Sequence, residues 1–406
     1  MTVVRYWISK AAPSAATAAI VLTAMFGLTA MTSLPARAQT YKEKVIYSFA
    51  GGTDGESPVA GVVRDSSGNF YGTTNTGGAD SAGTVFKLSK TGVETVLYTF
   101  TGGTDGYLPY AGVILDKSGI LYGTTAFGGA FNAGTIYEVN TVTSQETVLH
   151  SFVAGSTTDG SLPYAGLIED AKGNLYGTTL EGGDISCEEG EGCGVVFKFD
   201  AMTGKETVLY TFTGNPDGER PEASLIRDAE GNLYGTTSAG GPADAGTVFE
   251  VIAATRTESV LYSFTGGNDG KRPVANLARD TAGNLYGTTY MGGSALSGTV
   301  FKVDTSNQET VLYNFTGGAD GQYPFAGVII DSQGNLYGTT IFGGTSSDGV
   351  AFELDTAGAE TVLHTFNGSN GQYPVAILLP DGKGDFYSTT ELGGTHGMGT
   401  VFKLTP

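Results

Sequence analysis

Short apolar runs alternate with glycine-rich and acidic connections along residues 41–406. In the third repeat the runs lie at 164–169, 174–179, 194–199 and 206–212, and they are rich in β-branched and aromatic residues. Glycine, proline or an Asp-x-x-Gly step bounds each run, which is typical of strands and not of helices. The fourth run is apolar on both faces, as expected for a strand packed between two sheets. The pattern therefore predicts four short β-strands per repeat.

The phrase Gly-Asn-Leu-Tyr-Gly-Thr-Thr marks the second strand of every repeat. It stands unchanged at 173–179, 231–237, 283–289 and 334–340, and slightly changed at 68–74, 119–125 and 384–390. The aspartates before these copies are Asp65, Asp116, Asp170, Asp228, Asp280, Asp331 and Asp381, at steps of 51, 54, 58, 52, 51 and 50 residues. Seven such units of four antiparallel strands are typical of a β-propeller. We therefore expect an all-β fold, a seven-bladed β-propeller in which residues 41–406 form one domain.

The two ends of the repeat region differ in phase, and this predicts how the ring closes. Residues 45–49 match the fourth strand of a repeat, whereas residues 399–404 match the third. We expect the N-terminal strand to pair with the last blade, so that no strand edge is left open. Each blade then takes its inner strand from the Ala-Gly-Leu-Ile run and its outer strand from the Val-Leu-Tyr-x-Phe run.

The connections should divide between the two faces of the disc. Hairpins with paired glycines link the second and third strands, because glycine permits the positive φ of a tight reversal. The pairs are Gly77-Gly78, Gly128-Gly129, Gly182-Gly183, Gly240-Gly241, Gly292-Gly293, Gly343-Gly344 and Gly393-Gly394. We call the side with these hairpins the Gly-Gly face, and the Phe-Thr-Gly-Gly-x-Asp-Gly connections should also lie there. The Asp-x-x-Gly steps fit type I turns on the opposite face.

The Phe-Thr-Gly-Gly-x-Asp-Gly connections place an acidic residue at one recurring position. These residues are Asp54, Asp105, Asp159, Asp217, Asp269 and Asp320, with Asn370 in the last repeat. A calcium site needs several converging oxygen ligands. One aspartate followed by glycine instead suits a turn in which the carboxylate accepts backbone N–H groups. We expect turn chemistry, with calcium as the alternative.

The first 38 residues have the order of a secretory signal peptide. Arg5 and Lys10 precede an apolar, alanine-rich run, and 36–38 forms a small-residue triplet, so cleavage is expected after Ala38. The alternative is a transmembrane anchor, for which the apolar run is short. We expect a secreted or periplasmic monomer with no membrane span after cleavage.

Charge and cysteine content narrow the range of partners. The formal charge is -20, or -23 without the three basic residues of the leader, which disfavours nucleic acid and anionic lipid as partners. Cys187 and Cys193 are the only cysteines, and after an export signal we expect them to form a local disulfide that pins one loop of the Gly-Gly face. With no histidine or further cysteine nearby, we expect no metal and no cofactor.

The repeat resembles a known family. The combination of Gly-Asn-Leu-Tyr-Gly-Thr-Thr, Gly-Gly, Gly-Thr-Val-Phe-Lys and Leu-Tyr-x-Phe-Thr-Gly over 41–406 is similar to the bacterial choice-of-anchor tandem repeat family of the GloVer type. The resemblance implies export with assorted C-terminal sorting or anchoring segments, and it implies no established activity. This chain stops at Leu404-Thr405-Pro406 without an apolar tail, which favours a soluble product.

Catalytic chemistry finds little support. His150 and His364 replace strand tyrosines and His396 lies in a hairpin loop, so no Ser/His/Asp constellation can be assembled and we expect no catalytic residue. The Thr-Thr pairs recur in every repeat, and sevenfold recurrence argues for a role in the fold. Function should therefore lie where the repeats differ.

The repeats differ beside the recurring proline and after the Thr-Thr pair, both on the Gly-Gly face. The candidate ligand-binding residues there are Tyr110, Phe127, Tyr164, Arg220, Glu222, Arg272, Tyr290, Phe325 and Phe342. Aromatic faces with a few charges suit sugars or peptides. We expect an exported, non-enzymatic propeller that binds an extracellular glycan, peptide or protein partner. The alternatives are a secreted polysaccharide lyase or hydrolase using Glu181, Glu222 or Glu391, and a purely structural envelope or matrix component.

Overall fold

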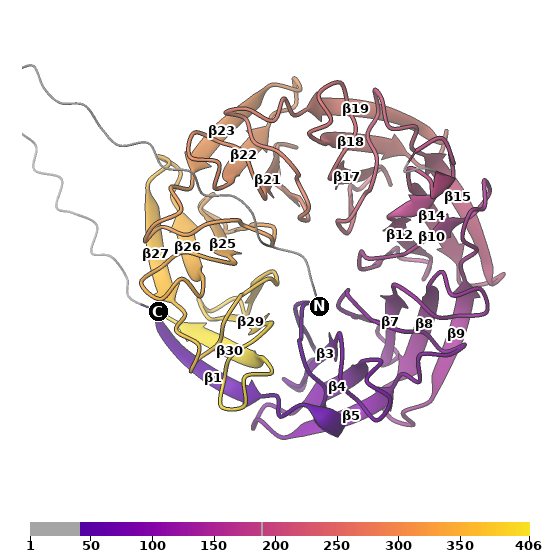
Figure 1. The fold of residues 1–406 in the computed structure, drawn as a ribbon, viewed down its shortest axis with the longest axis horizontal. Coiled ribbons are helices and arrows are strands. Elements are labelled where there is room, and N and C mark those ends of the chain that lie inside the picture. The colour runs from indigo at the N-terminus through magenta and orange to yellow at the C-terminus, as the bar shows by residue number, and fades with distance from the viewer. Residues whose placement is uncertain (1–40, 188–189) are drawn as a thin grey trace, which may run out of the picture. The chain divides into compact units, whose positions relative to one another are not determined.

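The computed structural model describes residues 41–187 and 190–406, and the expected signal peptide lies outside these residues. Residues Gln39–Pro406 form one compact unit. Seven four-stranded antiparallel sheets stand around an axis as the blades of a propeller (Figure 1), which confirms the predicted fold class. Among the residues described, no helix combines the length and the apolar character needed to cross a bilayer.

Each blade runs from a short inner strand to a long outer strand. Blade 1 has β2 (Val63–Arg64), β3 (Phe70–Thr74), β4 (Thr84–Leu88) and β5 (Glu94–Thr99). Blade 2 has β6 (Ile114–Leu115), β7 (Ile120–Thr125), β8 (Thr135–Asn140) and β9 (Glu146–Ser151). Blade 3 has β11 (Ile168–Glu169), β12 (Leu175–Thr179), β14 (Val195–Asp200) and β15 (Lys205–Thr211). Blade 4 has β16 (Ile226–Arg227), β17 (Leu233–Thr237), β18 (Thr247–Ile252) and β19 (Thr257–Ser263).

The remaining blades repeat this order. Blade 5 has β20 (Ala278–Arg279), β21 (Leu285–Thr289), β22 (Thr299–Val303) and β23 (Glu309–Asn314). Blade 6 has β24 (Ile329–Ile330), β25 (Leu336–Thr340), β26 (Val350–Leu354) and β27 (Glu360–Thr365). Blade 7 has β28 (Leu379–Pro380), β29 (Phe386–Thr390), β30 (Thr400–Thr405) and β1 (Lys42–Ser48). Outside the blades, β10 (Gly160–Ser161) pairs with β13 (Glu181–Gly182), and η1 (Gly52–Asp54) is a 3-10 turn.

Blade 7 closes the ring as predicted. Its outer strand β1 pairs antiparallel with β30, from Lys42 opposite Thr405 to Ser48 opposite Thr400. The N-terminal strand of the described chain therefore covers the edge that β30 would otherwise expose, and the last blade has the same four strands as the others.

The inner strands are much shorter than the sequence predicts, which is a correction. The run at 164–169 was expected as a full strand, but only Ile168 and Glu169 pair with β12. The residues before them crowd around the axis, where a Cβ on Gly166 would lie 2.9 Å from the Ser224 hydroxyl oxygen of the next blade. The Ala165 carbonyl accepts a hydrogen bond from Thr124 of the preceding blade. The Ala165 carbonyl thus bonds to a neighbouring blade, and Gly166 lies close to another.

The recurring phrase is explained by contacts within one turn. In blade 3, the Asp170 carboxylate accepts hydrogen bonds from the Asn174 backbone and side-chain nitrogens at 3.0 and 2.8 Å and from the Tyr176 hydroxyl at 3.0 Å. The Gly173 N–H donates to the Asp170 carbonyl at 3.0 Å, and Gly173 has a φ of 82°. The turn predicted from Asp-x-x-Gly is therefore confirmed, and the Asn and Tyr of the phrase brace its aspartate.

The Thr-Thr pairs hold the ring together. The first threonine of each pair donates its hydroxyl to an alanine carbonyl of the next blade, at 2.9–3.4 Å. The donor and acceptor pairs are Thr73 and Ala111, Thr124 and Ala165, Thr178 and Ala223, Thr236 and Ala275, Thr288 and Ala326, Thr339 and Ala376, and Thr389 and Ala60. The last bond crosses the closure, so a hydrogen bond of this kind links every pair of adjacent blades.

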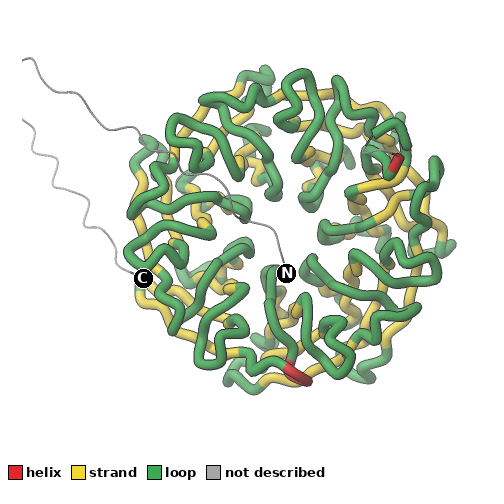
Figure 2. The backbone as a smooth tube through the Cα atoms, in the orientation of Figure 1, coloured by secondary structure: helices red, strands yellow, loops and turns green. Residues whose placement is uncertain are grey.

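The hydrophobic core lies between the blades. Each of seven buried clusters joins residues of two adjacent blades. At every junction an aromatic residue that follows an outer strand meets an aromatic residue on the third strand of the next blade, with centroids 5.0–5.3 Å apart and edge-on geometry. Figure 2 shows that loops cover much of the visible face and reach toward the axis. Strands and their cores thus form the frame, and loops form the variable surface.

Candidate functional site

A cavity of about 370 Å³ occupies the axis, lined by the inner segments of the blades. Each segment starts on the Gly-Gly face with the residue after a proline. These residues form the mouth of the cavity and are Val59, Tyr110, Tyr164, Glu222, Val274, Phe325 and Val375. Deeper in the cavity, the inner segments of the seven blades have similar sequences. The mouth is thus the level at which the cavity lining differs most from blade to blade.

The residue before each of these prolines has a left-handed backbone. These residues are Ser57, Leu108, Leu162, Arg220, Arg272, Tyr323 and Tyr373, with φ between 55° and 59°. At Arg220 the N–H donates to the Cys193 carbonyl and the carbonyl accepts from the Ser238 N–H, both at 3.0 Å. Such a conformation is costly for a residue with a Cβ and persists only where surrounding bonds enforce it. The frame therefore fixes the backbone of the chain in the same conformation where each blade enters the mouth.

A tyrosine patch occupies blades 2 to 4. Tyr110 and Tyr164 stack with centroids 4.6 Å apart and an interplanar angle of 17°. Burial raises the pKa of Tyr164 to about 12, helped by Tyr110 and by the Glu222 and Glu181 carboxylates and opposed by Arg220. These five residues define the tyrosine patch. Glu222 also accepts a hydrogen bond from the Ser238 hydroxyl at 2.6 Å, so its carboxylate is held beside the two rings.

An aromatic arc continues through blades 5 to 7. The Tyr290 ring lies 5.0 Å from Tyr323 and 6.1 Å from Phe325, with the Arg272 guanidinium 5.7 Å from its centroid. Phe342 lies 6.1 Å from Tyr323 and 5.0 Å from Tyr373. The arc therefore consists of Arg272, Tyr290, Tyr323, Phe325, Phe342 and Tyr373. Tyr323 and Tyr373 were missed as candidates, although their place before the proline could have identified them.

Two sequence-predicted residues lie outside these clusters. Phe127 faces Tyr107 across a backbone bridge, with ring centroids 6.3 Å apart, and makes no ring contact with the patch or the arc. Glu391 lies in the hairpin of blade 7, and burial raises its pKa. Of the three carboxylates considered for catalysis, Glu181 and Glu222 are therefore both near Tyr164, whereas Glu391 belongs to a different blade.

The cysteine loop borders the tyrosine patch. Cys187 and Cys193 form a disulfide with a Cα–Cα distance of 5.1 Å, which confirms the predicted pairing. The Cys193 N–H donates to the Asp184 carbonyl at 3.1 Å, and the Cys193 carbonyl accepts the Arg220 N–H. The disulfide loop therefore supports the left-handed residue that begins blade 4.

The acidic residues of the Phe-Thr-Gly-Gly-x-Asp-Gly connections lie at the outer rim of the propeller, where the outer strands of two adjacent blades meet. In the junction between blades 1 and 2, Asp105 accepts hydrogen bonds from the Tyr98 hydroxyl at 2.9 Å and from the Thr101 N–H and hydroxyl at 2.7 and 2.6 Å. These contacts are those of a braced turn, as the sequence predicts. The next outer strand adds Glu146. Burial and the Asp105 carboxylate raise the pKa of Glu146 to about 7.

This arrangement, which we call a rim junction, recurs seven times. The junctions are Tyr47, Asp54 and Glu94; Tyr98, Asp105 and Glu146; His150, Asp159 and Glu206; Tyr210, Asp217 and Glu258; Tyr262, Asp269 and Glu309; Tyr313, Asp320 and Glu360; and His364, Asn370 and Glu43. In each one the glutamate Oε1 is buried without a hydrogen-bond partner. Burial raises the pKa of these glutamates to about 7, and to about 8 for Glu206.

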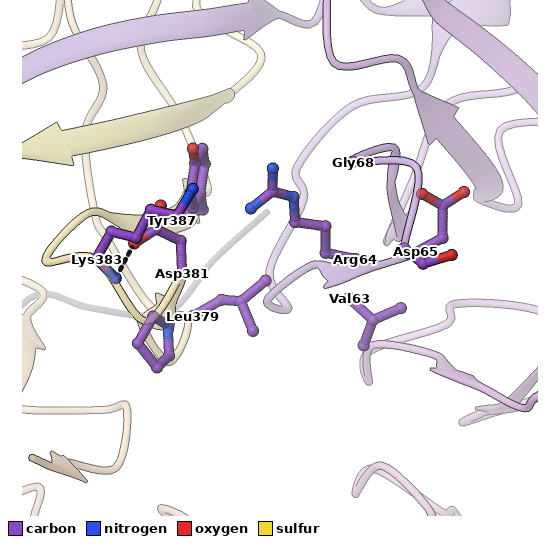
Figure 3. A pocket seen from close by; sticks show the side chains of 10 residues that line it. Val63, Arg64, Asp65, Gly68, Leu379, Asp381, Lys383 and Tyr387 are labelled. Carbon is purple, nitrogen blue, oxygen red and sulfur yellow. Dashed lines mark hydrogen bonds between the residues drawn. The ribbon is translucent and has the colours of Figure 1, made fainter. Parts of the chain in front are cut away.

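A further pocket lies between blades 1 and 7, away from the Gly-Gly face. It has a volume of about 600 Å³, and Figure 3 shows Arg64 and Tyr387 on its wall with Asp381 and Lys383 at its edge. The Arg64 guanidinium lies 5.4 Å from the Phe70 centroid and 5.5 Å from that of Tyr387. Two rings thus hold this cation at the contact between blades 1 and 7.

Comparison with known proteins supports the fold and the family. A sequence profile described as the Gloeobacter/Verrucomicrobia repeat matches residues 30–228 and 185–402. No curated protein matches the sequence.

Among solved structures, three resemble the chain with a TM-score above 0.5. An oligogalacturonate lyase in complex with manganese has 13% identity and a TM-score of 0.55, covering 90% of this chain and 96% of that one. An oligogalacturonate lyase from Vibrio parahaemolyticus has 11% identity and a TM-score of 0.51, with coverage of 90% and 96%. The extracellular domain of a protein described as a hybrid two-component system from B. thetaiotaomicron has 14% identity and a TM-score of 0.55, with 90% of this chain matching 41% of that one. At these identities the likeness concerns the fold alone.

Proposed function

Since the chain belongs to the Gloeobacter/Verrucomicrobia repeat family, we propose that it is an exported, non-enzymatic propeller that binds an extracellular oligosaccharide on the Gly-Gly face. The ligand lies across the mouth of the axial cavity, between the tyrosine patch and the aromatic arc. One observation carries the proposal: in every blade an enforced left-handed residue leads through a proline into the mouth residue, and the mouth residues vary between blades. Enforced strain at a surface hollow is a feature of binding sites.

The chemistry of the mouth suits a sugar. Tyr110 and Tyr164 offer a stacked pair of rings, and Tyr290 with Phe325 offers a second aromatic surface. Rings of this kind cover apolar faces while their hydroxyls reach polar groups. Glu222 supplies a fixed carboxylate that can accept hydrogen bonds from ligand hydroxyls. A few polar groups that fix orientation on a mainly aromatic surface are typical of a ligand site.

Export is supported by the disulfide and by the leader sequence. The bond between Cys187 and Cys193 suits an oxidising compartment. The expected cleavage after Ala38 would release the acidic propeller to the periplasm or the medium. A ligand met there would be an extracellular one.

A glycan array with the mature protein, followed by calorimetry on the strongest ligand, tests the proposal. Replacing Tyr164 or Tyr290 by alanine should weaken binding at least about tenfold, with unchanged melting as a check of folding. Phe131→Ala is the matched control, because Phe131 is 58% exposed in the blade 2 hairpin and outside both clusters. Equal affinity of the Tyr164→Ala, Tyr290→Ala and control proteins would refute this placement.

A lyase or hydrolase is the second candidate, and the raised pKa of Glu391 favours it. A carboxyl whose pKa is raised by burial can serve as a general acid. Incubating any bound oligosaccharide with wild type, Glu391→Gln and Glu222→Gln distinguishes the two functions. Product release that Glu391→Gln abolishes would replace the binding proposal by an enzymatic one.

A further inference from the structure

The rim junction between blades 2 and 3 brings together an imidazole and two carboxylates. His150 comes from the end of β9, Asp159 from the connection that follows, and Glu206 from the start of β15, the next outer strand along the rim (Figure 1). One ligand atom of each residue lies within 4.8 Å of those of the other two. His150 Nε2 is 3.3 Å from both Asp159 carboxylate oxygens.

This junction departs from the others at coupled positions. In five junctions a tyrosine hydroxyl donates to the aspartate, and four of these aspartates also accept a threonine hydroxyl. In this junction His150 occupies the position of the tyrosine, and Val153 occupies that of the threonine. The connection from Phe152 to Asp159 is also two residues longer than the one from Phe100 to Asp105. The side-chain donor to Asp159 within the described residues is then His150 alone. The change replaces hydroxyl donors by a nitrogen that can bind a cation.

Glu206, the third residue of the cluster, has a carboxylate oxygen without a hydrogen-bond partner. Glu206 Oε1 is buried and accepts no hydrogen bond. A buried carboxylate oxygen without a donor is costly, and a cation satisfies it. The His150 and Asp159 side chains are 21% and 12% exposed, so the cluster is sheltered yet reachable from solvent.

We propose that His150, Asp159 and Glu206 bind one divalent transition-metal ion, for which zinc is the best match. Imidazole nitrogen and carboxylate oxygen are ligand types that zinc accepts, and three protein ligands leave its fourth position to water. In a tetrahedral site with bonds of about 2.0–2.1 Å, neighbouring ligand atoms are about 3.3 Å apart, which is the His150–Asp159 spacing. The two carboxylates balance the charge of the ion. This site lies at the rim and is independent of the ligand proposed for the mouth.

The junction between blades 6 and 7 is a natural control. It also carries a histidine, His364, but Asn370 replaces the aspartate, and its side-chain nitrogen lies 2.9 Å from His364 Nε2. The Asn370 amide thus engages the imidazole, and one carboxylate, Glu43, remains. This junction should not bind zinc.

The experiment uses the mature protein freed of metal with a chelator and titrated with zinc chloride by calorimetry, with melting measured in parallel. We expect one equivalent of zinc to bind and to raise the melting temperature. His150→Tyr restores the residue of five other junctions and should fold normally, but should bind zinc at least about 100-fold more weakly. Glu206→Gln should also weaken binding strongly, whereas His364→Tyr should bind like wild type.

Several outcomes would overturn the proposal. They are no zinc binding by wild type, wild-type affinity in both His150→Tyr and Glu206→Gln, or loss of binding in His364→Tyr. If His150→Tyr does not fold, Glu206→Gln decides alone, because glutamine keeps the shape of the side chain. Tetrahedral absorption bands after cobalt substitution should appear in wild type and be absent in Glu206→Gln.

Discussion

At the scale of single residues, the rim glutamates have the least expected environment. Glu309 is typical: its Oε1 is buried without a hydrogen-bond partner, and burial together with Asp269 raises its pKa to about 7. The folded protein therefore holds a proton between pH 4.5 and about 7 that the unfolded chain has released. Native stability falls as the pH rises through this window, because the unfolded state binds fewer protons there.

Glu309→Gln should remove this loss, since glutamine does not ionise and its amide can donate to Asp269. At about pH 8 the variant should be more stable than wild type by ~1 kcal/mol, after discounting the pKa shift for partial solvent exposure. At about pH 5 the two should be equally stable. Urea unfolding at both values measures the difference. A variant that is less stable at the higher pH would show that Glu309 is ionised and stabilising.

The sequence allowed prediction of some residue environments and not others. The Asp170 turn follows from local chemistry, since its donors lie within six residues of it. The burial of Glu309 does not, because the preceding residues Ser306-Asn307-Gln308 look like an ordinary solvated turn. Asp269, its neighbour, is 40 residues away along the chain and comes close only when two blades pack.

At the scale of elements, the cysteine loop tests how far one hairpin depends on its cross-link. Replacing Cys187 and Cys193 by serine should cost about 2 kcal/mol or less, because the closed loop is short. The propeller should stay folded, because Cys187 and Cys193 contribute to only one of the seven cores between the blades. Thermal melting measures the loss. The chain has two cysteines, so treating wild type with a thiol reductant should reproduce the effect, whereas global unfolding on reduction would contradict it.

The paired length of the inner strands could not be predicted from the sequence. The Ala-Gly-Leu-Ile run has the composition of a strand, but near the axis the space is set by the neighbouring blades. A Cβ on Gly327 would lie 2.2 Å from the Asn276 carbonyl oxygen, so backbones approach closely there and bond across the junction. Local pattern gives the type of element, whereas its paired length depends on packing around the ring.

At the scale of the whole molecule, closure by β1 makes a quantitative prediction. Phe49, which follows β1, is fully buried with its centroid 5.1 Å from that of Phe86 in blade 1. Phe212 makes the same contact with Phe249 at 5.0 Å inside the ring. Phe49→Ala and Phe212→Ala should therefore each cost about 3–5 kcal/mol. Denaturant unfolding compares them, and a cost below about 1 kcal/mol for Phe49→Ala alone would mean that the ring is open in solution.

Blade number, closure and the division of loops between two faces could all be predicted, because the repeat carries them sevenfold. The candidate site could be predicted in part. Tyr110, Tyr164, Arg220 and Glu222 fall together because equivalent positions of adjacent blades are neighbours. Phe127 stays apart from them, since its side chain faces Tyr107 within its own blade. Aligning the repeats shows which positions are equivalent, but it does not predict the direction of a side chain within a blade.

The rim junctions also give the molecule an unusual titration curve. Histidine is ordinarily the side chain that titrates near neutral pH, and this chain has three histidines. Six of the seven rim glutamates, all except the proposed zinc ligand Glu206, have a pKa of about 7 and take over that role. The protein is therefore a proton buffer around neutrality, and at pH 7 it is several charges less negative than its formal -20. Its electrophoretic mobility should consequently change steeply over a pH range in which most acidic proteins keep a constant charge.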